Sequence, residues 1–195
     1  MSTITPSQTV GPFFAYGLTP NGRYAWNDVA TNDLVTPKLI GSRIRLEGTL
    51  YDGDGSPVPD GMIEIWQADG QGRFQSGQDA GGGLSNTAFK GFGRCATGAD
   101  GVFAFSTIKP GPVEGSFGGY QAPHILVAVF ARGMLVHAFT RIYFDDEPAN
   151  ASDPVLQVVP AERRATLVAK RQADGVEYRF DIRLQGDRET VFFDV

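Results

Sequence analysis

The sequence contains few of the residues from which metal centres and acid–base sites are most often built. Among its 195 residues there is one cysteine, Cys95, and there are two histidines, His124 and His137. A single cysteine cannot form an internal disulfide, and two histidines leave few ways to build a histidine-based metal centre. No basic residue or histidine is evident beside Cys95 as an activating partner, so we interpret it as an inert thiol on a strand. No ligand spacing joins His137 to His124.

Long apolar runs and an excess of positive charge are absent as well. No apolar stretch is long enough to cross a bilayer, and the first residues lack the basic segment and apolar core of a signal peptide. The net charge is −5 and the pI is near 5.0, which disfavours nucleic-acid binding, since phosphate recognition needs a concentrated basic patch. We therefore expect a cytoplasmic protein with neither nucleic acid nor membrane among its partners.

Glycine and proline, by contrast, are plentiful. The 25 glycines and 12 prolines mostly separate short apolar runs, as turns do between strands. Residues 43–51 and 176–184 alternate apolar and polar side chains, which is typical of strands with one buried face. Residues 124–130 and 134–143 are almost wholly apolar and flank a short turn, so they are predicted to be the most buried pair of strands.

The remaining segments complete the predicted fold. Residues 91–97 and 102–107 are separated by a short turn and are expected to pair as a hairpin. Residues 160–171 are the convincing helical candidate, with proline at the start and basic residues at the end. Residues 1–40 are interpreted as an N-terminal arm, and residues 41–195 as a single domain. The pattern predicts an all-β fold, an antiparallel β-sandwich with an extended arm and one short helix.

Five segments, in order, resemble the intradiol ring-cleavage dioxygenases, which open catechol rings between the two hydroxyls with non-haem ferric iron. The match extends over nearly the whole chain and is closest to the α chains of those members that are built from related α and β chains. The segments read PSQTVGPFF (6–14), GSPVPDGMIEIWQADGQGRF (55–74), GFGRCATGADGVFAFSTIKPGP (91–112), YQAPHILVAVFARG (120–133) and YRFDIRLQGDRETVFFDV (178–195).

The resemblance implies four positions for iron ligands, which in the family are two tyrosines and two histidines. The matching residues here are Phe74, Val113, His124 and Leu126. Phenylalanine, valine and leucine have no donor atom for ferric iron, and one imidazole cannot replace three lost ligands. We therefore expect this chain to carry no metal site and no catalytic residue, with His124 a remnant that packs or hydrogen-bonds.

The same resemblance implies a substrate-binding role for residues elsewhere in the chain. In the family the α chain presents a turn arginine and part of its arm to the active site of the β chain. The matching residues are Arg132, Thr9, Gly11 and Pro12. The implied partners are an iron-binding β chain in a repeated αβ unit, a small aromatic acid and O2. Fe(III) would be held by the partner chain, and the implied reaction converts 3,4-dihydroxybenzoate to 3-carboxy-cis,cis-muconate.

Two other functions remain open from the sequence. One is a non-enzymatic β-sandwich binding module that kept the scaffold without the chemistry, and the other is an active homomeric dioxygenase with displaced ligands. The arm around residues 6–14 and the C-terminal segment match the enzyme subunit, and a free-standing module has no need of them. The sequence therefore favours the subunit.

Overall fold

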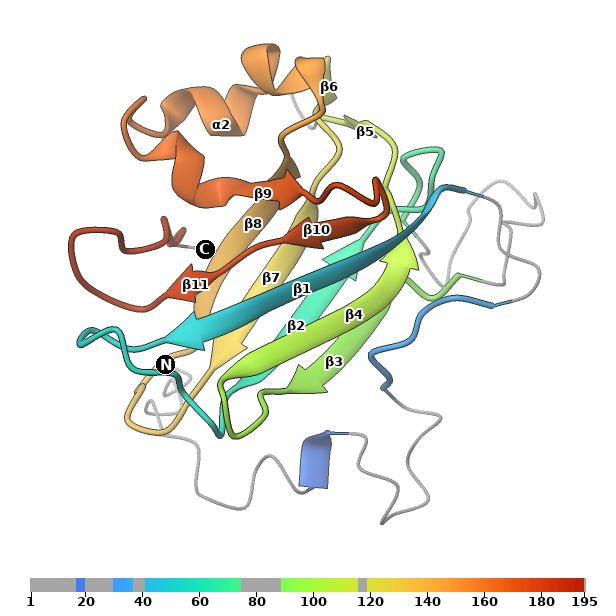
Figure 1. Ribbon diagram of the computed structural model, residues 1–195. Helices are drawn as coiled ribbons and strands as arrows, with labels where there is room; N and C mark the ends of the chain where they lie inside the picture. The colour runs from blue at the N-terminus through green and yellow to red at the C-terminus, as the bar shows by residue number, and fades with distance from the viewer. Residues whose placement is uncertain (1–16, 20–29, 37–40, 75–88, 116–118, 195) are drawn as a thin grey trace, which may run out of the picture.

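The computed structural model describes residues 17–19, 30–36, 41–74, 89–115 and 119–194. Two layers of strands face each other across one apolar core (Figure 1). The all-β prediction is confirmed. The strands are β1 (Arg43–Tyr51), β2 (Met62–Gln67), β3 (Phe92–Ala96), β4 (Val102–Ile108), β5 (Val113–Glu114), β6 (Tyr120–Gln121), β7 (Ile125–Phe130), β8 (Ala138–Phe144), β9 (Val168–Arg171), β10 (Glu177–Arg179) and β11 (Ile182–Arg183).

The main sheet is continuous and curls into a nearly closed sandwich. Its strands follow one another in the order β4, β1, β10 with β11, β9, β8, β7, β2 and β3, while β5 and β6 form a small separate pair. Most neighbours are antiparallel, but β1 runs parallel to β10 and β11, and β8 runs parallel to β9. The sheet is therefore mixed. Alternation in a sequence reports which face of a strand is buried and not the direction of its neighbour.

The predicted hairpin between residues 91–97 and 102–107 is wrong. β3 pairs with β2 and β4 pairs with β1, so the short turn between them carries the chain from one layer to the other. The described part of the arm lies between these two edges. There the backbone N–H of Arg94 donates to the carbonyl of Thr31 at 3.0 Å, and that of Leu34 donates to the carbonyl of Ser106 at 2.8 Å.

The helical segments differ from the prediction for residues 160–171. The α-helix α2 (Pro154–Val158) lies between the 3-10 turns η1 (Pro148–Ser152) and η2 (Arg164–Leu167), and residues 17–18 are helical as well. Residues 168–171 are β9, which pairs with the end of β8. The prediction missed α2 because five residues are too short to show a helical period.

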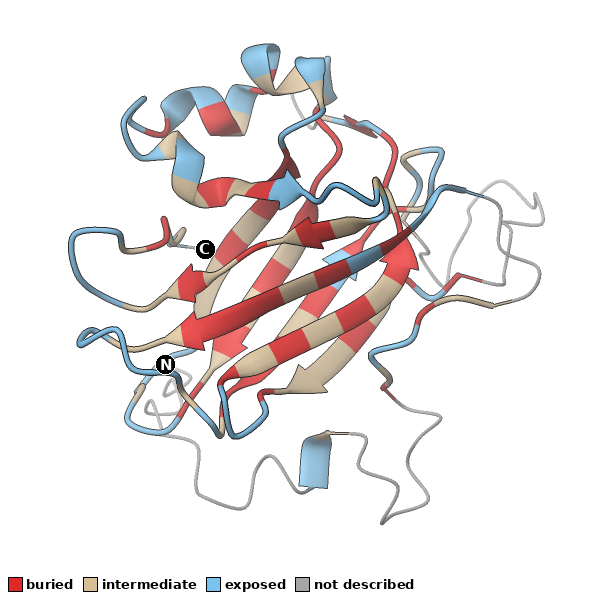
Figure 2. Ribbon diagram, in the orientation of Figure 1, coloured by how far each residue is buried: buried red, intermediate tan, exposed pale blue. Residues whose placement is uncertain are grey.

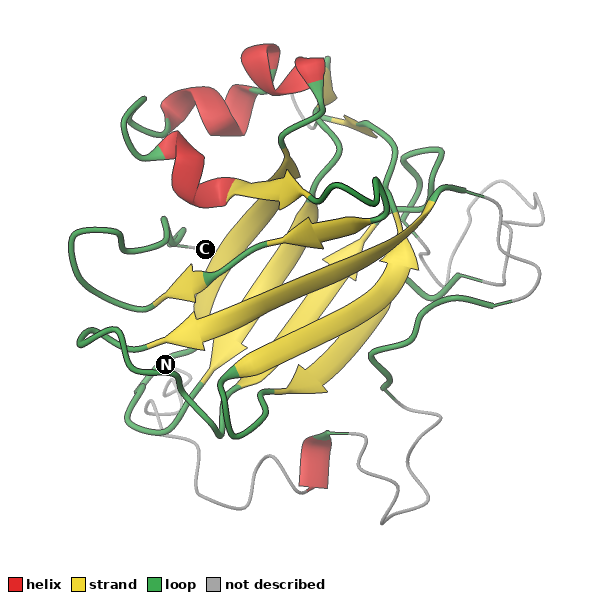
Figure 3. Cartoon of the chain, viewed as in Figure 1, coloured by secondary structure: helices red, strands yellow, loops and turns green. Residues whose placement is uncertain are grey.

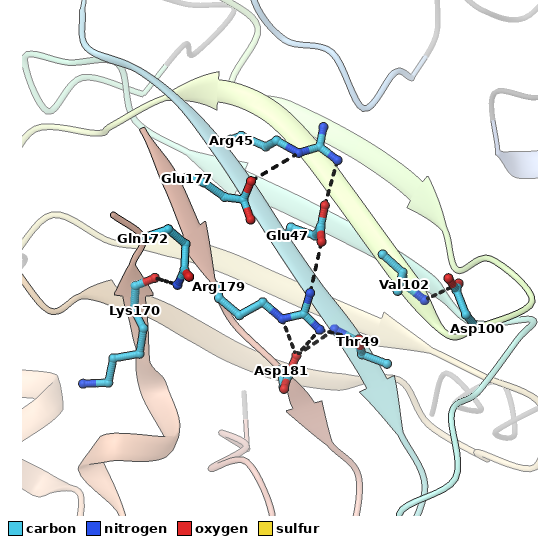
Figure 4. Close-up of polar contacts among 10 residues, drawn as sticks. All are labelled: Arg45, Glu47, Thr49, Asp100, Val102, Lys170, Gln172, Glu177, Arg179 and Asp181. Atoms are coloured by element: carbon cyan, nitrogen blue, oxygen red, sulfur yellow. Dashed lines mark hydrogen bonds and ion pairs between the residues drawn. The ribbon is translucent and has the colours of Figure 1, made fainter. Parts of the chain in front are cut away.

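Alternation along the strands separates the core from the surface (Figure 2). On the outward face of β1 and β10, charged residues form a ladder (Figure 4). Glu47 accepts from Arg45 at 2.8 Å and from Arg179 at 3.1 Å, and Arg179 also pairs with Asp181 at 3.0 Å. Asp181 in turn accepts the backbone N–H of Thr49 at 3.0 Å, which ties the break between β10 and β11 to β1. Partly exposed pairs of this kind stabilise by only ~0–1 kcal/mol each.

A second apolar cluster lies on the outer face of the sheet, between β8 and the segments that contain α2 and η2 (Figure 3). It includes Tyr143, Leu156, Leu167 and Val191. Further along the same face the covering is incomplete, and Trp66 of β2 is 37% exposed. No helix in the described ranges is both long and apolar enough to span a bilayer.

Candidate functional site

Strand pairing and ring stacking connect Leu126 with Phe74, two of the four positions that the resemblance assigns to iron ligands. Leu126 is the second residue of β7 and lies directly opposite Trp66 of β2. The indole of Trp66 stacks on the ring of Phe74, with centroids 6.3 Å apart and planes 3° from parallel. Trp66 of β2 therefore contacts Phe74, in the loop that follows β2, and pairs with Leu126 of β7.

Val113 approaches the same region from β5. It pairs with Gln121 of β6, just before His124 in the chain. The loop before Phe74 is tied to this segment, since the backbone N–H of Gly111 donates to the carbonyl of Asp69 at 2.9 Å. The four positions therefore gather around the start of β7, although they come from three separate stretches of the sequence.

Glycine is required where the two loops meet. Gly72 has a φ of +79°, and a β-carbon at this position would collide with the backbone carbonyl of Pro112. Only glycine adopts this conformation readily while leaving room for so close an approach. The segments GQGR (70–73) and KPGP (109–112) thus form two loops that are in contact.

The side chains gathered here do not suit a ferric ion. Phe74, Val113 and Leu126 are hydrocarbon, and ferric iron needs hard oxygen or nitrogen donors. Within the part of the chain that the structure describes, no group of three or more His, Cys, Asp or Glu residues is placed to hold a metal. Of the four positions, His124 alone carries an atom that could bind a metal.

His124 is buried and hydrogen-bonded. Its Nδ1 lies 2.7 Å from the carbonyl oxygen of Ala122, so the neutral ring donates there through Nδ1–H. Burial lowers the pKa of His124 by disfavouring the charged form, and the positive charge of Arg141 acts in the same direction. The ring also lies against Tyr143, with centroids 5.8 Å apart. His124 is thus a neutral packed residue.

A buried carboxylate organises the backbone around His124. Asp153 is fully buried and accepts the hydroxyl of Tyr143 at 3.0 Å and the backbone N–H of Ala122 at 2.8 Å. It also caps α2 by accepting the backbone N–H groups of Val155 and Leu156. Burial raises the pKa of the Tyr143 phenol far above its usual range, so Tyr143 stays neutral.

Arg132 lies beyond the opposite end of β7. The strand between His124 and Arg132 spans about 20 Å at ~3.3 Å per residue, so Arg132 does not face the four ligand positions of its own chain. Its guanidinium forms an ion pair with Asp60, and its side chain is 57% exposed. Continuing the β2–β7 register by two residues beyond the Met62–Phe130 pair sets Asp60 opposite Arg132.

Among the other predicted residues, Thr9, Gly11 and Pro12 lie outside the described residues. Cys95 is part-buried, and burial raises the pKa of its thiol, which is the behaviour of an unreactive cysteine. The sequence analysis did not identify Asp60 as the partner of Arg132. This pairing depends on the register between β2 and β7.

A pocket of 530 Å³ opens on the outer face of the sheet, at the place where Leu126 and Trp66 meet. Strand register sets four side chains in a row along its floor, one from each of β3, β2, β7 and β8. They are Phe92, Trp66, Leu126 and Arg141. The pocket lies beside Leu126, and its walls are chiefly apolar.

Comparison with known proteins identifies the fold as that of a dioxygenase. A family model described as "Dioxygenase" matches residues 11–186. The protocatechuate 3,4-dioxygenase alpha chain of Burkholderia cepacia is 52% identical over 204 residues, covering 100% of both chains. The beta chain of the same enzyme and organism is 32% identical, covering 82% of this chain and 72% of its own.

A solved structure gives the same result for the fold. The dioxygenase domain of a carbohydrate-binding fusion protein from Streptomyces sp. SirexAA-E superposes with a TM-score of 0.63 at 27% identity, covering 80% of this chain and 88% of that one. The chain belongs to the intradiol dioxygenase family. Within the family its similarity to the alpha chain far exceeds its similarity to the beta chain.

Proposed function

We propose that this chain is the α subunit of a protocatechuate 3,4-dioxygenase and that it works together with an iron-holding β chain. The observation that carries the proposal is the set of hydrocarbon side chains at Phe74, Val113 and Leu126, on a scaffold that still gathers these positions. The full-length identity to an alpha chain supports the same assignment. The reaction of the assembled enzyme is the oxygen-dependent opening of 3,4-dihydroxybenzoate to 3-carboxy-cis,cis-muconate.

In this proposal Fe(III) belongs to the partner chain and the α chain completes the substrate pocket. Arg132 provides a cation for the substrate carboxylate, because a guanidinium meets a carboxylate with charge-assisted hydrogen bonds in a fixed plane. Thr9, Gly11 and Pro12 of the arm line the same pocket. The distance of Arg132 from its own chain's ligand positions supports a role across an interface, since the residue is exposed and directed elsewhere.

The turn that carries Arg132 also exposes apolar surface. Leu135 is 67% exposed and Val136 is 61% exposed, both in the turn between β7 and β8. Large side chains of this kind, adjacent to each other in one turn, are typical of surfaces that a partner covers. The turn therefore supports the hetero-oligomer as well as the placement of Arg132. The single cysteine suits the reducing cytoplasm, where we place the enzyme.

Co-expression with the β chain of a protocatechuate 3,4-dioxygenase tests the proposal. We expect the two chains to co-purify as a large αβ oligomer that cleaves protocatechuate, with an interface of obligate size, roughly 2,000 Å² or more. This chain expressed alone should have no dioxygenase activity. A monomer that never associates with the β chain would instead support the binding-module alternative, and turnover by this chain alone would support the homomeric enzyme.

A further inference from the structure

We propose that the pocket on the outer face of β2, β3, β7 and β8 binds a small aromatic monocarboxylate, held by Arg141 at one side and by aromatic rings along the walls. The site is on this chain and needs no metal. It is independent of the role proposed for Arg132, which lies beyond the other end of β7.

The walls of the pocket suit an aromatic body. Trp66 and Phe92 contribute from neighbouring strands with ring centroids 6.3 Å apart, and Phe139 and Phe193 contribute from β8 and the C-terminal segment. The backbone N–H of Phe193 donates to the carbonyl of Phe139 at 2.8 Å, which fixes the C-terminal wall against the sheet. A volume of 530 Å³ lies within the usual range of small-molecule pockets, roughly 300–1,000 Å³.

Arg141 is the cation of this pocket. Its Nη1 donates to Oε1 of Gln121 at 2.7 Å and lies 3.5 Å from the hydroxyl of Tyr143. Both partners are neutral, and no carboxylate within the described ranges forms an ion pair with Arg141. The guanidinium is therefore held in place while its charge remains available to an anion.

The position of the guanidinium is set by the buried network behind it. Tyr143 accepts from Arg141 and donates to Asp153, and Asp153 is anchored by backbone N–H groups. A cation positioned in this way loses little side-chain freedom when it meets a carboxylate, so more of the interaction energy appears as affinity. This pre-organisation distinguishes Arg141 from a surface arginine on a flexible stem.

Two acidic residues also line the pocket, and they define how the anion must sit. Glu64 is already paired with Arg94 at 2.6 Å, so it adds little net negative charge. Asp194 is exposed at the rim and forms no ion pair within the described part of the chain. A carboxylate ligand therefore points toward Arg141 and places its ring toward Trp66, away from the Asp194 rim.

Fluorescence of Trp66 measures binding directly. The full chain contains two tryptophans, so Trp26→Phe leaves Trp66 as the only one. Benzoate should quench or shift this emission saturably, and benzyl alcohol, a neutral probe of the same size, should bind more weakly. Arg141→Gln should weaken benzoate about ten- to a hundredfold, which is the effect of losing a charged hydrogen bond, and leave benzyl alcohol unchanged.

Two further variants keep the test decisive if Arg141→Gln disturbs folding. Leu126→Trp fills the pocket beside Arg141, the cross-strand neighbour of Leu126, and should abolish binding of both probes. Asp194→Asn removes the like charge at the rim and should tighten benzoate alone. Absence of saturable benzoate binding in the wild-type pocket, or equal affinities across these variants, would overturn the proposal.

The αβ complex shows whether the pocket stays open after assembly. Equilibrium dialysis with radiolabelled benzoate should count one more site per αβ pair in the wild type than in a complex carrying Leu126→Trp. An equal count would mean that a partner segment, and not a small acid, occupies the pocket, and it would contradict the proposal. Loss of enzyme activity is not part of this readout, so the outcome is separate from that of the proposed function.

Discussion

Asp60 and Arg132 lie opposite each other just outside the paired parts of β2 and β7, and their side chains form an ion pair. The paired register of the two strands ends at the Met62–Phe130 pair, and two residues beyond that pair Asp60 comes opposite Arg132. In the isolated chain the pair is largely exposed, with the Arg132 side chain at 57% and the Asp60 side chain at 30%. The carboxylate thus holds in advance the arginine that we assign to substrate binding.

Arg132→Ala in the αβ enzyme should reduce kcat/KM for protocatechuate about ten- to a hundredfold, the effect of losing a charged hydrogen bond of ~1.5–3 kcal/mol. Turnover of catechol, which lacks the carboxylate, should change little. Steady-state assays on both substrates provide the measurement. An unchanged ratio between the two substrates would make Arg132 an ordinary turn residue.

Asp60→Asn should produce a smaller effect on the same ratio. The variant keeps the shape of the side chain and removes the charge that orients Arg132. We therefore expect KM for protocatechuate to rise about two- to fivefold, with kcat retained. Exposed pairs couple by ~0.2–1 kcal/mol, and the upper part of this range, ~0.4–1 kcal/mol, corresponds to two- to fivefold. In an enzyme that already carries Arg132→Ala, Asp60→Asn should have no further effect. Additive losses in the double variant would show that Asp60 acts independently of Arg132.

His124 should make stability sensitive to mild acid. Its pKa is lowered in the folded chain because of burial, so only the unfolded chain takes up a proton as the pH falls below about 6.5, the ordinary histidine value. Above that pH the residue contributes no pH dependence, and below it the folded state loses stability relative to the unfolded state. Between pH 8 and pH 5.5, the free energy of unfolding measured by urea denaturation should therefore fall more in the wild type than in His124→Asn. Identical pH dependence in the two proteins would contradict the buried neutral state.

Asp153→Ala should be among the most destabilising single changes in the chain. The substitution leaves the hydroxyl of Tyr143 and the backbone N–H groups of Ala122, Val155 and Leu156 without their acceptor in a buried setting. We expect the free energy of unfolding to fall by about 3–5 kcal/mol. The exposed Asp187→Ala is the matched control, expected to stay within about 0.5 kcal/mol of the wild type. Equal denaturation midpoints for the two variants would refute the anchoring role of Asp153.

Local patterns predicted much of the fold. The alternation in 43–51 and 176–184 identified most buried residues of β1, β10 and β11, and the apolar segments 124–130 and 134–143 contain β7 and nearly all of β8. The second segment was predicted to start too early, because residues 134–137 belong to the turn and Leu135 and Val136 are exposed. The sequence did not predict that 91–97 and 102–107 lie in different layers. A short turn is compatible with a hairpin or with a crossing between layers, and the partners supplied by β1 and β2 decide between them.

The candidate site was predicted unevenly for a similar reason. The missing donors at Phe74, Val113 and Leu126 are visible in the sequence, because a side chain without a donor atom has none in any fold. The pocket around Arg141 and the Asp60–Arg132 pair depend on register between strands that are distant in the chain. Sequence periodicity identifies the face on which a residue lies but not the residue opposite to it.

Metal analysis of this chain purified alone and of the assembled αβ enzyme tests the central claim most directly. The account predicts one ferric iron per αβ pair in the active burgundy complex, with none in the lone, colourless, inactive chain. Stoichiometric ferric iron in the lone chain, with the colour of tyrosinate-to-iron charge transfer and turnover of protocatechuate, would contradict it.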